Sequence, residues 1–315
     1  MRNVKSGWSQ TIPSLRTNEN FTLETANSAF VMENYNILEE YKDTLHENFH
    51  ADISPVNFAD SQVTASRIND WVKDMTNNKI DSLIDEDMIN GLTRLVLVNA
   101  IYFKGDWETK FDPKKTQQSA FYVSNVKNVE TDMMMLTEEF PRAVIDQLDV
   151  TMLEMPYKGD RIVMQIVLPN ERSQGLKTVE EKLGNVDIND LFQKNQRTVK
   201  TKVKLPKFKV SQSSSLTDHL KKLGMEEMFS QGGADFSGID GTRNLFVGFV
   251  QQEVFIEVNE EGSEAAAATG MGMMMRSMPL PPEEFTVDHP FIFYIRDKLT
   301  GMLLFQGRIS DPSAS

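Results

Sequence analysis

The chain has 315 residues, a length typical of one large domain with a substantial apolar core. Its 33 basic and 46 acidic residues give a formal net charge of −13, which argues against a general nucleic-acid binder. The chain has no cysteine, which excludes disulfides and thiol chemistry but fits either redox compartment. No apolar run approaches ~20 residues, so the sequence predicts no membrane-spanning helix.

A helix is predicted over residues 35–50, where the apolar residues recur with helical periodicity. Its end contains His46 and His50 in the pattern H-E-x-x-H, which in zinc proteases places two metal ligands on one helix face. No glycine-and-histidine continuation follows His50, and the two other histidines, His219 and His289, lie in no motif that would supply a third ligand. No G-x-S-x-G sequence is present either. We therefore predict no metal site, no cofactor and no catalytic residue.

An alternating strand is predicted over residues 254–258, and it runs directly into residues 259–270, which read NEEGSEAAAATG. In an extended conformation this segment would place four small side chains on one face, those of Ser263, Ala265, Ala267 and Thr269. Glu264 would point to the other face, so the segment could enter a sheet with nothing bulky inward. The same composition also suits an exposed helix or a linker, and these residues alone leave the three interpretations open.

Seven further stretches have sequences that carry a family resemblance. In chain order they are residues 68–72, 76–80, 95–107, 203–208, 234–239, 285–295 and 305–309. Their sequences, order and spacing resemble the serpin family, and the resemblance runs from about residue 21 to Pro312, nearly the whole chain. In wording, especially over residues 283–297, the chain is similar to arthropod serpins, those of ticks among them.

The resemblance implies an α+β fold with a large central β-sheet, further β-sheets, surrounding helices and an exposed reactive-centre loop at about residues 260–280. Residues 1–315 would then form a single serpin domain. Residues 21–30 look like an early strand of the family's central sheet, which in other members follows several helices. Because only about 20 residues precede this strand, we expect the first helices to be missing and the domain to be N-terminally incomplete. The chain opens on a polar stretch without a secretory signal.

The family spacing also implies the position of the bait. From the hinge glutamate to the residue whose carbonyl is attacked, serpins usually span seventeen residues, which leads from Glu260 to Arg276. The reactive bond would then join Arg276 and Ser277, and an arginine there suits trypsin-like serine proteases, whose pocket carries a carboxylate. A shift by one residue would place Met275 in the pocket and favour elastase- or chymotrypsin-like enzymes.

After cleavage, serpins insert the hinge as a new strand of the central sheet and trap the tethered protease. By resemblance the hinge comprises Glu260, Glu261, Gly262, Ser263, Glu264, Ala265, Ala266, Ala267, Ala268 and Thr269. A charged or bulky residue at its inward positions would slow insertion and turn the inhibitor into a substrate. The methionines beside the bait are either flexible filler or targets of oxidative control, and they are Met271, Met273, Met274, Met275 and Met278.

The resemblance further implies a sheet-opening region formed by Trp107, Lys207, Glu260 and Asn99. Lys207 and Glu260 are expected to form a salt bridge near Trp107, where insertion begins. The alternative is two surface charges that contribute ~0–1 kcal/mol. On the strand before the hinge the family usually has a histidine where this chain has Gln252, a departure that a different hydrogen-bond network could absorb.

These features predict a suicide inhibitor of trypsin-like serine proteases that acts as a monomer, binds neither nucleic acid nor a membrane, and is not an enzyme. The resemblance implies an extracellular setting for the full-length protein. The alternative is a non-inhibitory or substrate-like serpin with a binding or carrier role, including a shortened form that has lost insertion. The hinge composition favours inhibition, whereas the expected loss of the first helices favours the alternative.

Overall fold

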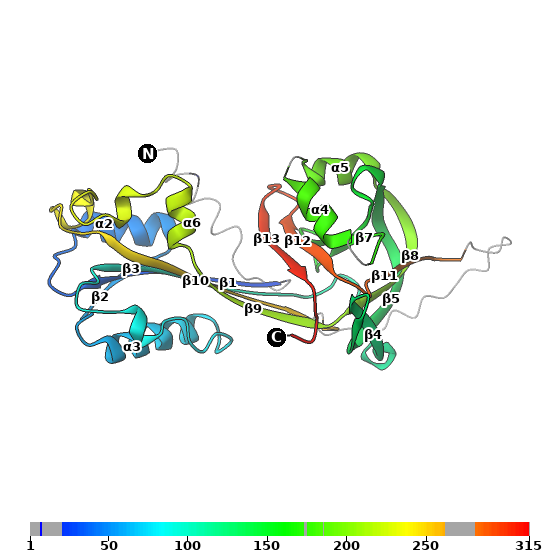
Figure 1. Ribbon diagram of the computed structural model, residues 1–315, viewed down its shortest axis with the longest axis horizontal. Helices are drawn as coiled ribbons and strands as arrows, with labels where there is room; N and C mark the ends of the chain where they lie inside the picture. The colour runs from blue at the N-terminus through cyan, green and yellow to red at the C-terminus, as the bar shows by residue number, and fades with distance from the viewer. Residues whose placement is uncertain (1–6, 8–20, 173–174, 185, 262–280, 315) are drawn as a thin grey trace. The chain divides into compact units, whose positions relative to one another are not determined.

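The computed structural model describes residues 7, 21–172, 175–184, 186–261 and 281–314. The chain divides into two units, of which unit 1 comprises residues 1–104 and 210–256 and unit 2 comprises residues 105–209 and 257–315. A five-stranded sheet belongs to unit 1 apart from the ends of three strands, and an eight-stranded sheet belongs to unit 2 (Figure 1). Sheets with surrounding helices in both units give the predicted α+β class. Whether residues 1–315 act as the predicted single domain stays a prediction.

The five-stranded sheet combines strands that lie far apart in the sequence. Its strands are β1 (Phe21–Met32), β2 (Asp52–Val56), β3 (Leu95–Gly105), β9 (Phe208–Ser215) and β10 (Val247–Val258), in the order β2-β1-β3-β10-β9. Two neighbouring pairs run parallel, β1 with β2 and β3 with β10. The strand predicted over residues 254–258 is therefore the end of β10, and it lies beside β3.

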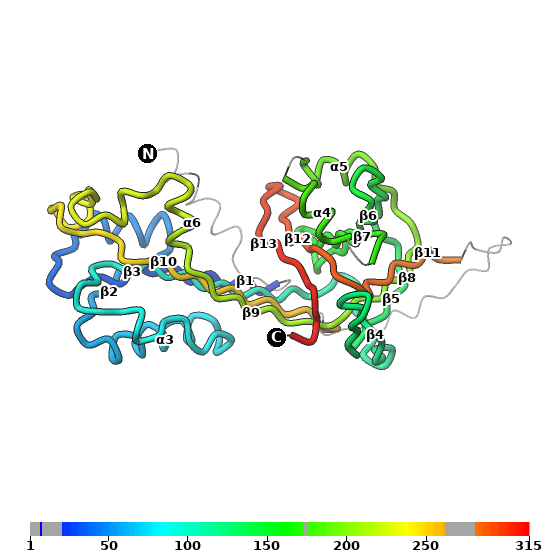
Figure 2. The backbone as a smooth tube through the Cα atoms, viewed as in Figure 1, coloured from blue at the N-terminus to red at the C-terminus, as the bar shows by residue number. Residues whose placement is uncertain are grey.

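Helices cover both faces of this sheet (Figure 2). On one face α3 (Ser61–Met75) packs Ile68 and Val72 against a core that contains Phe30 and Val98. The second face holds another core, which includes side chains of three helices and one turn. These are α2 (Glu39–Thr44), α6 (Thr217–Lys222), α7 (Ser237–Asp240) and the single turn Glu227–Phe229. A further single turn occupies Glu86–Met88. The sheet is thus the buried middle layer of unit 1.

The eight-stranded sheet is mostly antiparallel. Its strands are β4 (Gln117–Ser124), β5 (Lys127–Ile145), β6 (Val150–Pro156), β7 (Ile162–Pro169), β8 (Arg197–Pro206), β11 (Glu283–Thr286), β12 (Phe291–Asp297) and β13 (Leu303–Ile309). The order is β11-β8-β5-β6-β7-β12-β13, with β4 paired to β5. The short strand β11 runs parallel to β8 at one edge of this order. One face packs on α4 (Gly175–Leu183) and α5 (Ile188–Asn195), and short turns occupy Pro113–Lys115 and Asp146–Leu148.

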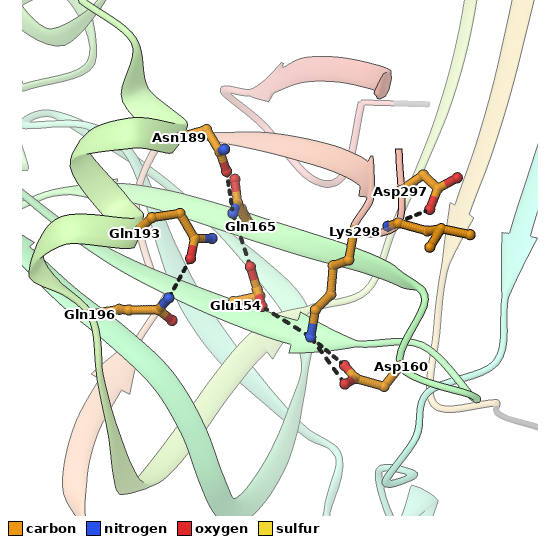
Figure 3. Close-up of polar contacts among 9 residues, drawn as sticks. Glu154, Asp160, Gln165, Asn189, Gln193, Gln196, Asp297 and Lys298 are labelled. Carbon is orange, nitrogen blue, oxygen red and sulfur yellow. Dashed lines mark hydrogen bonds and ion pairs between the residues drawn. The ribbon is translucent and has the colours of Figure 1, made fainter. Parts of the chain in front are cut away.

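A chain of polar side chains leads from the interior of unit 2 to its surface (Figure 3). Gln165 of β7 donates from Nε2 to Glu154 Oε2 on β6 at 2.9 Å and to Asn189 Oδ1 on α5 at 3.2 Å. Lys298, which follows β12, donates to both carboxylate oxygens of Asp160 and lies 3.9 Å from Glu154 Oε1. Because buried polar groups need partners, this chain specifies how β6, β7 and α5 pack together.

Asp297, the last residue of β12, is completely buried and is held by Arg161. Arg161 donates from Nη2 to Oδ2 at 2.7 Å and from Nε to Oδ1 at 3.2 Å, and the Leu299 N–H donates to Oδ1 at 2.9 Å. Burial disfavours the charged carboxylate, but these hydrogen bonds outweigh burial and hold the pKa of Asp297 below its ordinary value. The pair therefore depends on both charges being present.

Candidate functional site

Glu260, two residues beyond the end of β10, is the centre of a compact polar cluster in unit 2. Its Oε2 forms an ion pair of 2.9 Å with Lys207 Nζ, and its Oε1 accepts a hydrogen bond of 2.8 Å from Thr116 Oγ1. The Glu260 side chain is only 10% exposed, whereas that of Lys207 is 36% exposed. The expected ion pair between Glu260 and Lys207 is therefore present, and its role in sheet opening stays a prediction.

Trp107 contacts the residue just before Glu260. Its indole Nε1 donates to the backbone oxygen of Asn259 at 3.0 Å. The indole is almost fully buried and stacks on Tyr157, with ring centroids 4.4 Å apart and ring planes 11° from parallel. The Tyr157 ring lies so close to Gly105 that a Cβ there would meet it at 2.3 Å, so a glycine is required at the end of β3. Trp107 thus fixes the chain where it leaves the sheet.

The environment of Glu260 favours its charged form. Burial opposes ionisation of the carboxylate, but the hydrogen bonds from Lys207 and Thr116 and the positive charge of Lys207 outweigh it. The pKa of Glu260 is therefore lower than its ordinary value. An adjacent pair, Lys209 Nζ and Glu257 Oε1 at 3.4 Å, repeats the pattern on the same surface. Both pairs line a hollow of ≈ 390 Å³ beside the end of β10.

Asn99 belongs to a different group of side chains, which lies in unit 1. Gln252 of β10 donates from Nε2 to Asn99 Oδ1 at 2.6 Å, and Asn99 of β3 donates from Nδ2 to Asn27 Oδ1 on β1 at 2.7 Å. This relay of amides links three neighbouring strands of the five-stranded sheet. It is a hydrogen-bond network of the kind that we expected could absorb the departure from histidine at residue 252.

The sequence reasoning missed two members of these groups, Thr116 and Asn27. Thr116 is 144 residues away from Glu260 along the chain, and Asn27 is 72 residues away from Asn99. No local motif marks either residue, so only the folded structure could reveal them. Asn27 does lie in the predicted strand at residues 21–30, on a neighbour of β3.

The predicted reactive bond and most of the hinge lie outside the described residues. These are Arg276 and Ser277 together with Gly262, Ser263, Glu264, Ala265, Ala266, Ala267, Ala268 and Thr269. The described chain reaches Glu261 after β10 and resumes at Pro281, two residues before β11. Residues 262–280 therefore connect a strand of the five-stranded sheet to an edge strand of the eight-stranded sheet.

The H-E-x-x-H segment forms part of a short helical region. The predicted helix over residues 35–50 is realised as α2 followed by a π-helical turn over Leu45–Phe49. His46 Nδ1 lies 3.8 Å from Asp52 Oδ1, and both side chains are exposed. Among the residues that the structure describes, no group of three His, Cys, Asp or Glu side chains could hold a metal ion. Over the same residues, no helix combines the length and apolarity needed to cross a bilayer.

Several known proteins similar to this chain are named inhibitors. Leukocyte elastase inhibitor A of Mus musculus is 42% identical over 296 residues, which cover 92% of this chain and 78% of the relative. Intracellular coagulation inhibitor 2 of Tachypleus tridentatus is 44% identical over 287 residues, covering 91% and 69%. The crystal structure of Serpin48 from the insect Tenebrio molitor superposes with a TM-score of 0.85 at 37% identity, covering 98% of this chain and 80% of that one.

The expected extracellular location is wrong, because the relative at 44% identity is an inhibitor named intracellular. Relatives from Mus musculus and Tachypleus tridentatus match at similar identity, so the affinity with arthropod serpins stays a prediction. The likeness to named inhibitors also shows that the chain is not an enzyme. The family model described as serpin (serine protease inhibitor) matches residues 1–312, and together with these relatives it shows that the chain belongs to the serpin family.

Proposed function

We propose that the chain is a suicide inhibitor of serine proteases. The protease cleaves the bond between Arg276 and Ser277, and residues 260–269 then insert into the five-stranded sheet while the enzyme is still bound as an ester. Insertion competes with hydrolysis of that ester. The small side chains at alternate hinge positions support this proposal because they offer no steric obstacle to entry.

The parallel pairing of β3 with β10 carries the proposal. These strands pair from Leu95 with Val247 to Phe103 with Ile256, and β10 leads directly towards residues 262–280. A segment that turned back after β10 would run antiparallel to it, and therefore also antiparallel to β3. Entry between the two strands would replace one parallel pairing with two antiparallel ones, which are slightly more stable per residue. The described sheet therefore has a topology that gains from the new strand.

The class of target follows from the residue offered at the bait. Arg276 favours a trypsin-like protease, because a guanidinium pairs with the carboxylate at the base of such a pocket. The other register offers Met275, and the relatives named leukocyte elastase inhibitor favour that alternative. We give priority to Arg276 because the charge of the pocket decides specificity in these enzymes.

The purified chain should be mixed with trypsin and, separately, with an elastase, followed by denaturing gel electrophoresis and mass spectrometry of released peptides. A trypsin complex that survives denaturation, with a fragment that begins at Ser277, is the expected result. A complex with elastase alone and a fragment that begins at Arg276 would establish the rival register. Cleavage without any complex would establish the non-inhibitory, substrate-like alternative.

The role of insertion is tested by matched substitutions in the hinge. Ala267→Glu places a charge on the face that enters the sheet, whereas Ala266→Glu places the same charge on the opposite face. We expect Ala267→Glu to be cleaved by trypsin without forming a complex, and Ala266→Glu to keep most of the complex. Equal complex formation by the two variants would contradict strand insertion.

A further inference from the structure

Two arginines lie directly opposite each other in the eight-stranded sheet. Arg142 of β5 and Arg197, the first residue of β8, are register partners on antiparallel neighbours. Side chains in such a pair point to the same face, and like charges there destabilise a sheet. The Arg142 side chain is only 15% exposed, so solvent screens its charge poorly. The Arg197 side chain is 66% exposed, so solvent screens its charge better, and an anion between the two guanidinium groups relieves the remaining repulsion.

Glu283, the first residue of β11, supplies that anion. Arg142 Nη1 donates to its Oε2 at 2.5 Å, and Arg197 Nη2 donates to its Oε1 at 2.8 Å. Each carboxylate oxygen therefore bonds to a different arginine from a different strand. Charge-assisted bonds of this kind are about twice as strong as neutral hydrogen bonds.

The site keeps a binding capacity that Glu283 does not use. Nε of Arg142 is buried and has no hydrogen-bond partner among the described residues. An unpartnered buried donor is uncommon, and here it belongs to a group that already binds an anion. The two arginines thus hold one carboxylate between them, and one of the two guanidinium groups has a further donor that no described residue uses.

Glu283 begins the strand that follows the loop, so its contacts with the two arginines anchor that strand. The strand β11 pairs with β8 through four residue pairs from Glu283 to Thr286, and it lies at the edge of the sheet order (Figure 1). It follows immediately after residues 262–280 and the short link of Pro281 and Pro282. So short a parallel strand has few backbone bonds of its own. Its side-chain anchor therefore determines where the downstream end of the loop is held.

We propose that Arg142 and Arg197 form an anion-binding site for a carboxylate, which Glu283 occupies within the same chain. Glu283 is then a positioning residue for the downstream side of the bait, and this second part rests on the proposed function. The neighbouring Glu284 offers a matched control, because its side chain is 67% exposed and its Oε1 lies 3.7 Å from Lys202 Nζ.

The anion site is tested by chemical rescue, using the thermal unfolding midpoint of the full chain. In sodium chloride, Glu283→Ala should lower the midpoint by about 2–4 °C, and replacing chloride with the same concentration of sodium formate should restore at least half of the loss. Glu284→Ala should show neither effect, and the double variant Arg197→Gln/Glu283→Ala should lose most of the formate response. A Glu283→Ala variant that behaves like Glu284→Ala, or that does not distinguish formate from chloride, would overturn the site.

If Glu283→Ala does not fold in chloride, Glu283→Gln keeps the size of the side chain and removes its charge. Its midpoint should lie below that of Glu284→Gln, and equal midpoints would overturn the proposal.

The positioning role of Glu283 is read from the moles of inhibitor consumed per mole of trypsin inhibited. Glu283→Ala should raise this ratio about threefold or more, formate should lower it again, and an unchanged ratio would refute the positioning role. Failure of the wild-type chain to inhibit would refute the proposed function alone, since the midpoint measurement does not depend on inhibition.

Discussion

Lys207 and Glu260 meet through a 2.9 Å contact between Nζ and Oε2, two residues past the end of β10. The second oxygen of the same carboxylate is occupied by Thr116, so Glu260 is bound from two separate parts of unit 2. Trp107 holds the backbone oxygen of the preceding residue, Asn259. A displacement of Asn259 or Glu260 would therefore break contacts that hold these two adjacent residues.

The coupling energy of the ion pair between Glu260 and Lys207 can be measured with a double-mutant cycle of Glu260→Gln, Lys207→Met and the double variant. We expect a coupling of about 1 kcal/mol in the free energy of unfolding, because the carboxylate is buried but solvent partly screens Lys207. The pair Asp190 and Lys194, which is exposed on α5, is the control and should give about 0.3 kcal/mol. Equal couplings in the two pairs would show that the burial of Glu260 adds nothing.

Glu260 should also make stability depend on pH. Its pKa is lowered in the folded protein, so its stabilising contribution is fully present above its unfolded pKa of about 4.3. That contribution is lost as the pH falls through the lower folded value. In urea unfolding, the difference between wild type and Glu260→Gln should thus be largest near neutral pH and should shrink at about pH 3. A difference that stays constant over this range would contradict the assignment.

Breaking the buried pair of Arg161 and Asp297 should destabilise unit 2 strongly. Asp297→Asn leaves the guanidinium without its counter-charge in a place where Asp297 is 0% exposed, so we expect a loss of about 2–3 kcal/mol. Asp160→Asn removes an exposed charge that contacts Lys298 and should cost about 0.5 kcal/mol or less. Chemical unfolding of both variants checks this prediction, which would be refuted by similar losses.

The amide relay in unit 1 predicts a specific effect at residue 252. Gln252→Ala leaves Asn99 Oδ1 without its 2.6 Å donor, and we expect it to cost about 1–2 kcal/mol. Gln252→His restores a ring N–H donor and should recover part of this loss. Gln212→Ala, which removes an exposed amide on β9, should be close to neutral. If Gln252→Ala lowered the free energy of unfolding no more than Gln212→Ala, the amide relay would not contribute to stability.

Much of the fold was predictable where the signal is local. The alternation over residues 254–258 indicated a strand, and these residues form the end of β10. The helical periodicity over residues 35–50 indicated a helix, but only Glu39–Thr44 is α-helical, and a π-helical turn with His50 in the left-handed region ends it. Periodicity reports which face of a segment is apolar, and it does not fix where the last hydrogen bonds form.

The candidate site was predictable only in part. The resemblance placed Glu260 and Lys207 together, and the structure shows their ion pair. The same resemblance grouped Asn99 with them, whereas Asn99 bonds to Gln252 and Asn27 in unit 1. The resemblance thus led to the ion pair but not to every partner, because hydrogen-bond partners are chosen by side-chain geometry and not by position in a motif. The role of these residues in sheet opening stays a prediction.

The sequence by itself determined the family and the α+β class, because both depend on residues that are neighbours in the chain or on their spacing. The alternating hinge and the position of the candidate bait were read from the same kind of signal and stay predictions. The tertiary structure decided which distant residues meet: Thr116 with Glu260, and Arg142 with Arg197 around Glu283. The contacts of the two arginines depend on the pairing register of β5, β8 and β11, and a shift of one residue would turn each side chain to the opposite face. The contact of Thr116 with Glu260 joins residues just outside strands and depends on how the loops around them fold. No local pattern records that register, so only the folded chain reveals an arginine pair that shares a carboxylate.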